Sequence, residues 1–385
     1  MREGWQIKKV SEIAKHSLGK MLDKAKNKGE PKPYLRNLNV RWFDFDLSDV
    51  LKMPFLPMEV EKYTAVKGDV LICEGGYPGR AAIWEQDEPI YFQKALHRVR
   101  FHEPERNKWF IYYLLSKDLD GTLKNHFNGA GIQHFTGEAL AQFPVPLPPL
   151  PEQHRIVALL DEAFAGLAIA KANAVQNLQN ARAIFESHLQ SVFSERGEGW
   201  VEKELCEVCT LINGRAYKKD EMLSAGPYPL LRVGNFFSNR DWYYSDLELE
   251  ADKYCDKGDL LYAWSASFGP RIWDGDKVIY HYHIWKVLPK KTIVEKRFLL
   301  YLLEWDVDQI KLAHGTGTTM MHVSKGSMES RVVPIPPLHL QSGIVSKLDS
   351  LREETQRLTR LYERKLAALE ELKKSLLHQA FNGEL

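Results

Sequence analysis

The sequence lacks the features that mark a membrane or secreted protein. It contains no apolar run near the ~20 residues that span a bilayer, and its first ten residues, MREGWQIKKV, lack the apolar core of a signal peptide. Only four cysteines occur among 385 residues, which are too few and too unevenly spaced for a disulfide framework. We therefore expect a folded cytoplasmic protein with no membrane contact.

The chain also lacks an excess of either charge. Its formal net charge is +1, which gives no overall sign of a nucleic-acid partner. The charges are unevenly distributed, since residues 1–36 hold ten Lys or Arg against four Asp or Glu. Because phosphate attraction acts over about a Debye length of ~8 Å, this local basic patch can bind DNA on a neutral protein.

Signatures of catalysis are missing as well. We find no glycine-rich cofactor fingerprint after a strand, no P-loop, and no Asn-Pro-Pro-aromatic tetrad of the kind that adenine methyltransferases use. GTGT from Gly315 resembles a phosphate loop only superficially, because the lysine of a P-loop does not follow it. The sequence therefore shows no catalytic machinery, and we interpret this GTGT as a structural turn.

One cysteine pair has the spacing of a metal or redox motif. Cys206 and Cys209 form a CxxC pair, but a structural zinc site needs four ligands and no second pair follows at finger-like spacing. The pair lies on an amphipathic segment, VEKELCEVCTLI. We expect both cysteines to be buried and predict no metal site.

What the sequence does contain is a long-period internal repeat. The same short motifs occur twice in the same order: Gly4-Trp5 and Gly199-Trp200, Leu35-Arg36 and Leu231-Arg232, KGDVL from Lys67 and KGDLL from Lys257, Gly129-Ala130-Gly131 and Gly315-Thr316-Gly317. A histidine follows each GxG turn, with Ser or Thr two residues later (His134, His322). Proline-rich segments then begin at Phe143 and Val332. The chain is a tandem duplication.

Each copy combines two kinds of pattern. Short runs of aromatic and β-branched residues broken by Gly and Pro favour an α+β domain. The segment after each domain is apolar at every third or fourth residue, which is typical of an amphipathic helix. We predict two pseudo-symmetric globular domains and two long helices, with these bounds: domain 1–150, central helix 151–195, domain 196–338, C-terminal helix 339–385.

The two helices are expected to pair as an antiparallel coiled coil that separates the domains. A helix from 151 to 193 is ~65 Å long at 1.5 Å per residue, and a lone helix exposing its apolar stripe is costly. The alternative, in which each helix packs on its own domain, is disfavoured because ~65 Å exceeds the width of such a domain. The spacer positions are Ile156, Leu160, Leu167, Leu178, Phe185, Leu348, Leu358, Leu369 and Leu376.

Two related domains on a rigid spacer can engage two sites only when the separation of the sites matches the spacer, which suits a split target on double-stranded DNA. The chain resembles the specificity subunits of bacterial type I restriction-modification systems. The likeness is carried by the GxG turns, the proline-rich exits, the LPEQ entry to the central helix and the closing LHQAFNGEL.

This resemblance implies a set of partners. The segments 1–150 and 196–338 are then target-recognition domains that each read one part of a bipartite DNA sequence, and the helices set the gap and bind two modification subunits. Those subunits carry S-adenosylmethionine and methylate adenine, and restriction/translocase subunits join for cleavage. The chain itself then holds no cofactor and is a non-catalytic subunit.

Base-contact chemistry selects candidate residues within each domain. Arg reads guanine, Asn and Gln read adenine, and Lys and Ser mainly contact phosphate. The candidates are Lys20, Lys24, Arg36, Asn37, Asn39, Gly76 and Arg80, then Asn213, Arg215, Tyr217, Lys218, Arg232, Asn235, Ser265, Ser267 and Arg271. Arg36 and Arg232 occupy matching positions in domains that should read different bases, so a structural or phosphate role suits both better. His97 and His134 fit structural roles.

Two other functions are weighed against this one. The chain is a methyltransferase or nuclease in its own right if the purified chain binds S-adenosylmethionine or cleaves DNA. It is a protein-protein scaffold if it shows no salt-dependent DNA binding even with partners present.

Overall fold

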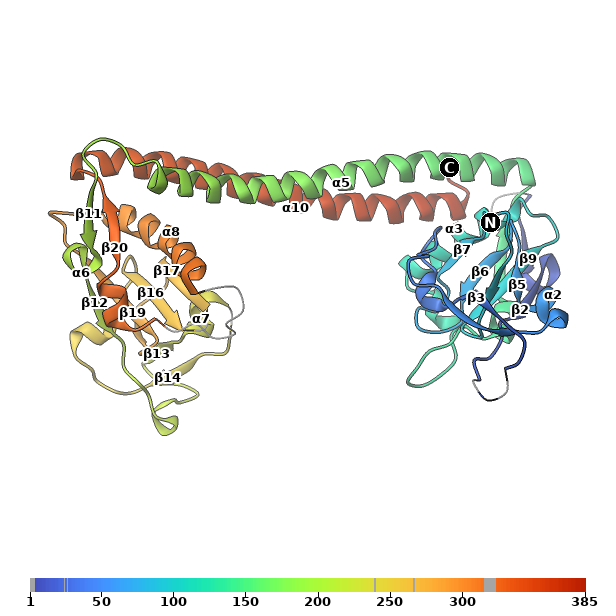
Figure 1. Cartoon of the computed structure of the whole chain (residues 1–385), viewed down its shortest axis with the longest axis horizontal. Coiled ribbons are helices and arrows are strands. Elements are labelled where there is room, and N and C mark those ends of the chain that lie inside the picture. The colour runs from blue at the N-terminus through green and yellow to red at the C-terminus, as the bar shows by residue number, and fades with distance from the viewer. Residues whose placement is uncertain (1–3, 24, 26, 239, 266, 315–322) are drawn as a thin grey trace. The chain divides into compact units, whose positions relative to one another are not determined.

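A computed structural model describes residues 4–23, 25, 27–238, 240–265, 267–314 and 323–385 (Figure 1). The chain forms two compact units, which we call unit 1 (1–175 with 363–385) and unit 2 (176–362). These units do not follow the predicted boundaries, because each long helix is divided between the two units. No helix in the described part of the chain is both long and apolar enough to cross a bilayer.

Unit 1 contains a two-stranded ribbon, two four-stranded sheets and short helices. The ribbon pairs β1 (Gln6–Lys9) with β10 (Pro144–Leu147). The first sheet has the order β2 (Ala14–Leu18), β9 (Leu96–Phe101), β6 (Val70–Cys73), β7 (Ala81–Ile83). The second has the order β4 (Leu51–Phe55), β3 (Glu30–Leu35), β8 (Ile90–Phe92), β5 (Thr64–Ala65). The helices of the domain are α1 (Val10–Ile13), α2 (Val60–Tyr63), α3 (Arg106–Leu119) and α4 (Gly137–Gln142).

Unit 2 repeats this topology strand for strand. Its ribbon pairs β11 (Val201–Glu204) with β20 (Val332–Ile335). Its sheets have the orders β12 (Cys209–Asn213), β19 (Ile284–Pro289), β16 (Leu260–Ser265), β17 (Ser267–Ile272), and β14 (Tyr243–Ser245), β13 (Tyr228–Leu231), β18 (Val278–Tyr280), β15 (Tyr254–Cys255). Its helices are α6 (Leu205–Val208), α7 (Val233–Phe237), α8 (Lys296–His314) and α9 (Lys325–Glu329). The predicted α+β duplication is confirmed.

The repeated KGDVL and KGDLL motifs each lead into a central strand that is covered on both faces. In β6, Val70 and Ile72 pack in the core that contains α3, whereas Leu71 and Cys73 pack in the core formed with the second sheet. The β16 strand alternates in the same way. Because successive side chains point to opposite faces, a strand buried on both sides is apolar throughout.

The Lys-Gly-Asp part of each motif is a tight turn. Gly68 and Gly258 have φ values of +92° and +95°, which strain any residue with a Cβ. The following aspartate accepts a backbone N–H within the turn and pairs with a cation on the neighbouring strand: Asp69 with Val66 and Arg100, Asp259 with Asp256 and Lys286. This repeat is therefore structural.

The Ser or Thr that follows each repeated histidine caps a helix. Thr136 Oγ1 accepts the N–H of Ala139 at the start of α4, and Ser324 Oγ accepts the N–H of Ser327 at the start of α9. Such caps satisfy backbone donors that the helix leaves unpaired. The GxG turn of the second copy, 315–317, and the histidine at 322 lie outside the described residues.

The long helices α5 (Leu150–Ser194) and α10 (Leu338–Asn382) contain 45 residues each and are green and red in Figure 1. In unit 1, Arg155 donates to a main-chain oxygen of Leu385 at 2.7 Å, and Lys171 pairs with Glu370 at 2.6 Å. Arg155 precedes Lys171 in the chain, whereas its partner Leu385 follows Glu370, the partner of Lys171. The two helices therefore run antiparallel in unit 1. In unit 2 the guanidinium of Arg352 lies 4.5 Å from the ring centroid of Phe185.

The predicted spacer residues serve both helix pairing and domain packing. Ile156, Leu160 and Leu348 are buried in the core of their own unit, and Phe185 and Leu376 pack against those cores. The remaining positions are half-buried: Leu167, Leu178, Leu358 and Leu369. Pairing of the two helices and packing of each helix on its own domain were predicted as alternatives. Within each unit they occur together, because one face of the helical pair covers the domain.

One constellation joins helix and domain in both units. In unit 1, Lys108 Nζ lies 2.7 Å from Asp161 Oδ2, and the hydroxyl of Tyr112 donates to Asp161 Oδ1 at 2.6 Å. In unit 2 the same carboxylate position is Asp349, which accepts from Arg297 and Tyr301. Burial and the bond to Asp349 raise the pKa of Tyr301 to about 12, so its hydroxyl stays protonated and donates.

The expectation for the cysteine pair was wrong in one respect. Cys209 is buried, but Cys206 is exposed. The physical reason is that Cys206 lies on the outer side of the short helix α6, whereas Cys209 begins β12 and faces the core. Among the described residues, no three or more His, Cys, Asp or Glu side chains gather as a metal site would require.

Candidate nucleic-acid interface

In unit 1 the structure brings two predicted segments together. The Asn37 side chain donates to the carbonyl oxygen of Gly75 at 3.0 Å, and the guanidinium of Arg80 donates to the carbonyl oxygen of Asn37 at 3.1 Å. Gly76 has a φ of +76°, and a Cβ there would collide with the Asn37 amide nitrogen. Asn37, Gly76 and Arg80, predicted separately along the sequence, therefore form one cluster whose close approach requires glycine.

Exposed apolar and aromatic side chains accompany this cluster. The guanidinium of Arg80 lies 4.8 Å from the ring centroid of Tyr77, which is 49% exposed. Leu38, next to Asn37, is 61% exposed, and Ile132, in the GxG loop of the first copy, is 75% exposed. Mixed apolar and hydrogen-bonding side chains of this kind suit base edges and thymine methyl groups.

Arg36 and Asn39 have structural contacts. Arg36 pairs with Asp49 at 2.6 Å, and its side chain is 16% exposed. Asn39 is buried, and its amide donates to the carbonyl oxygens of Asp46 and Asp49 at 2.9 and 3.0 Å. In unit 2 the matching residue Asn235 donates in the same way. The shared asparagine therefore closes the loop that follows the repeated arginine, which is consistent with a structural role at these repeated positions.

The basic N-terminal stretch is partly neutralised within unit 1. Lys20 is buried, and its ammonium lies 2.5 Å from Glu59 Oε2 and 2.9 Å from the carbonyl oxygen of Pro54. Its predicted contact with DNA would require this ion pair to break. Lys24 lies outside the described residues.

In unit 2, Arg215 and Tyr217 come together. Arg215 pairs bidentately with Glu221 at 2.9 and 2.7 Å and lies 5.0 Å from the ring centroid of Tyr217. The bonds from Arg215 lower the pKa of Glu221 to about 2, so this carboxylate is ionised at neutral pH. Lys218 donates its backbone N–H to Glu221. Asn213 is exposed, and its carbonyl oxygen accepts from Lys253.

Arg232 lines two hollows of unit 2. Their volumes are about 300 and 420 Å³, and both are also lined by Gly234 and Arg240. The guanidinium of Arg232 lies 5.1 Å from the ring centroid of Tyr243. The first hollow also contains His281 and His283, so Arg232 faces a cluster that the sequence did not single out.

Neither Arg271 nor Ser265 lines these hollows. Arg271 donates to the carbonyl oxygen of Phe236 and to Asp274, both at 2.9 Å. Ser265 is buried, and its backbone pairs with Ser267 where β16 meets β17. A direct base contact from Ser265 is disfavoured by its burial.

The residues predicted from the sequence do not include two turns, which follow the parallel-paired strands β8 and β18. The turn after β8 contains Gln93, Lys94 and Ala95, and the turn after β18 contains His281, Tyr282 and His283. They went unnoticed because their side chains differ completely between the two copies. The available signal was a glycine before each bridging residue, Gly19 and Gly214, where a Cβ would collide with the backbone of the turn.

The turn of unit 2 carries a cluster of rings. The Tyr282 and His283 centroids are 3.9 Å apart, and those of Trp264 and His283 are 5.0 Å apart. Burial lowers the pKa of His281 to about 4, with His283 and Arg232 adding to the shift. At neutral pH the His281 ring is therefore neutral and has one donor and one acceptor nitrogen.

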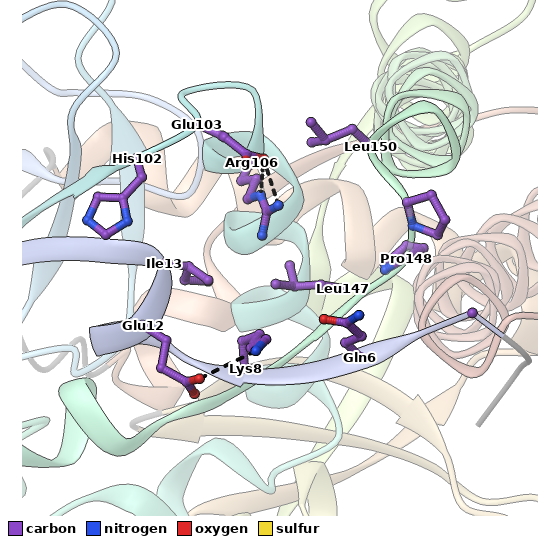
Figure 2. Close-up of a pocket in the computed structure, with 12 residues that line it drawn as sticks. Gln6, Lys8, Glu12, Ile13, His102, Glu103, Arg106, Leu147, Pro148 and Leu150 are labelled. Carbon is purple, nitrogen blue, oxygen red and sulfur yellow. Dashed lines mark hydrogen bonds and ion pairs between the residues drawn. The ribbon is translucent and has the colours of Figure 1, made fainter.

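A separate pocket of about 440 Å³ lies in unit 1 beside β1 and the start of α3 (Figure 2). Its charged side chains pair with one another: Lys8 lies 3.6 Å from Glu12, and Arg106 lies 2.6 Å from Glu103. None of the predicted DNA-contacting residues lines it. We therefore do not include this pocket in the candidate interface.

Comparison with known proteins gives a family match over most of the chain. Residues 2–177 and 197–370 each match the model of the type I restriction modification DNA specificity domain. The type I restriction enzyme MjaVIII specificity subunit of Methanocaldococcus jannaschii is 21% identical over an alignment covering 100% of this chain and 93% of that protein. The type I restriction enzyme EcoBI specificity subunit of Escherichia coli is 23% identical, but the alignment covers 53% of this chain and less than half, 43%, of that relative.

A solved structure has the same fold. It comes from work on complex assembly and conformational transition of the type I R-M system, and it matches with a TM-score of 0.81 and 20% identity. The match covers 100% of this chain and 99% of that one.

Proposed function

Because the chain belongs to the family of type I restriction modification DNA specificity domains, we propose that it reads a bipartite DNA target, one half-site per unit, and directs partner enzymes to it. The observation that carries this proposal is the relation between the units. They share every sheet and its strand order, yet they carry different side chains around the repeated arginines Arg36 and Arg232. A common scaffold with different exposed chemistry suits two different half-sites.

The proposal includes the partners. Two modification subunits bind the chain, carry S-adenosylmethionine and methylate adenine in the target, and restriction/translocase subunits join them on double-stranded DNA in the cytoplasm. The paired helices α5 and α10 set the gap between half-sites. The chain is the non-catalytic member of this complex, in keeping with a sequence that lacks a cofactor fingerprint.

A domain exchange tests the proposal. The full chain, with its modification subunits, is compared with a chimera in which residues 1–150 come from another specificity subunit, and methylated adenines are mapped on genomic DNA. We expect one half-site to change while the other half-site and the gap stay the same. The matched chimera, exchanged over 196–338, should change the opposite half-site. An unchanged target in both chimeras would refute the proposal.

A second measurement addresses catalysis. The purified chain alone should neither bind S-adenosylmethionine nor cleave DNA. Methylation by the chain without its partners would make it an enzyme in its own right. With partners present, DNA affinity should fall steeply with added salt, because binding to phosphates releases counterions.

A further inference from the structure

The turns after β8 and β18 have the same backbone in both units. In unit 1, Lys20 donates its N–H to Phe92 and accepts one from Lys94, at 3.1 and 2.9 Å. In unit 2, Arg215 does the same with Tyr280 and Tyr282, at 3.1 and 3.0 Å. These matched bonds align the two turns residue by residue.

A second matched backbone hydrogen bond joins each turn to one residue outside it. The N–H of Glu74 donates to the carbonyl oxygen of Ala95 at 2.9 Å, and the N–H of Trp264 donates to the carbonyl oxygen of His283 at 3.0 Å. Glu74 and Trp264 are therefore equivalent. Each unit has four matched positions: Gln93, Lys94, Ala95 and Glu74 in unit 1; His281, Tyr282, His283 and Trp264 in unit 2.

These positions lie beside the repeated arginine and reach solvent. Gln93 donates its N–H to the carbonyl oxygen of Leu35 at 3.0 Å, and His281 donates to that of Leu231 at 2.9 Å, so each turn adjoins the residue before Arg36 or Arg232. In both turns the middle residue is exposed and its two neighbours are half-buried. The scaffold therefore presents the same three positions in the same way.

The chemistry at these positions differs between the units. Gln93 offers the amide that pairs with adenine, Lys94 the ammonium that pairs with guanine, and Glu74 a carboxylate that accepts from cytosine. The unit 2 turn offers aromatic and imidazole rings instead, with apolar faces that suit thymine methyl groups.

The unit 2 turn is also held rigidly. Trp264 Nε1 donates to the carbonyl oxygen of Tyr282 at 2.9 Å. A Cβ at Gly214 would collide with the backbone of Tyr280 and His281, so the backbone at Gly214 lies directly against the turn. Side chains on such a fixed turn lose little further freedom on binding, which favours discrimination between bases.

We infer that the two turns are the specificity-determining elements: residues 281–283 with Trp264 select the bases of one DNA half-site, and residues 93–95 with Glu74 select those of the other. This inference rests on the proposed function, since it assigns base reading to particular residues of each unit.

A turn exchange tests the inference. His281→Gln, Tyr282→Lys and His283→Ala are introduced together into the full chain, and methylation by the complex is mapped as before. We expect methylation of the original target to fall about tenfold or more relative to targets altered in the unit 2 half-site, since a good base contact discriminates by about that factor. The unit 1 half-site and the gap should not change.

Two further variants make the result decisive. Leu288→Ala, at an exposed position of β19 outside the hollows beside Arg232, is the matched control and should leave both half-sites unchanged. Tyr282→Ala alters only the exposed middle residue of the turn, and it tests the inference if the triple variant does not fold. A folded turn variant with the original specificity would overturn the inference.

The outcomes separate the inference from the proposed function. If the unaltered complex methylates no split target, the proposed function fails. If it methylates one, and a folded turn variant keeps the same specificity, only the assignment to the turns is wrong.

Discussion

Unit 1 and unit 2 carry different side chains at turns whose backbones make the same hydrogen bonds. Their sheets have the same strand order, and the turns after β8 and β18 make the same backbone hydrogen bonds. At those turns the side chains change from Gln-Lys-Ala to His-Tyr-His. Positions that repeat in both sequence and structure, such as Asp161 and Asp349, join the parts of a unit. The comparison separates residues that hold the scaffold from residues that can vary upon it.

Some interactions within the scaffold also differ between the units. In unit 2, Arg331, the residue before β20, pairs with Asp306 of α8, whose side chain is 2% exposed. At the matching place in unit 1, Phe143 precedes β10 and is itself buried in the core. The two units thus use different chemistry at one position, and their stabilities should respond differently to mutation there.

The largest expected effect comes from Arg331→Met. It leaves the buried carboxylate of Asp306 without its ion-pair partner, which should destabilise unit 2 by about 3 kcal/mol. Hydrogen exchange, read separately for amides of each unit, measures the loss with unit 1 as the reference. The double variant with Asp306→Asn should recover part of it. Equal losses in both units would contradict this local assignment.

The next effect compares the buried glutamines at the helix entries. Gln341 donates to the carbonyl oxygens of Ile293 and Pro336 and accepts a hydrogen bond from the N–H of Glu295. Among the described residues, Gln153 donates only to the carbonyl oxygen of Pro148. Truncation to Ala leaves more buried groups unpaired at Gln341, so we expect losses of about 2 kcal/mol for Gln341→Ala and about 1 kcal/mol for Gln153→Ala. Denaturant unfolding followed by exchange in each unit tests the order. Equal losses would break the comparison.

The shared carboxylates should behave alike. Asp161→Ala and Asp349→Ala each remove one ion pair and one tyrosine hydroxyl bond, from side chains that are 37% and 34% exposed. Solvent screening limits each loss to about 1.5 kcal/mol. Exchange rates of the amides in α3 and α8 report the two effects. A loss in one unit that is several times larger than in the other would show that the contact is not equivalent.

The smallest effect concerns the repeated turn glycines. Gly68 and Gly258 have positive φ, and nothing lies within 4 Å of an added Cβ at either position. Gly68→Ala and Gly258→Ala should therefore cost only the backbone strain, about 1 kcal/mol each. Thermal unfolding of the two variants should give closely similar shifts. A much larger loss at one position would mean that its turn packs differently.

The candidate site was only partly predictable. Arg36, Asn37, Gly76 and Arg80 were chosen by residue type. In the structure Asn37 bonds to Gly75, the residue before Gly76, and accepts a bond from Arg80. Lys20 was chosen for its charge, but its ammonium is bonded to Glu59, which is 39 residues away. Neither pairing has a local signal, because the groups involved are distant in the sequence.

The sequence by itself determined the duplication, the α+β class and the two long helices. Repeats and the periodicities of strands and helices are local properties that are visible without contacts. Only the tertiary structure decided which charges are paired, which face of each helix covers its domain, and that the turns at 93–95 and 281–283 adjoin the repeated arginines. Those outcomes depend on hydrogen bonds and packing between distant segments, and a glycine such as Gly214 shows its purpose only when the neighbouring backbone is in place.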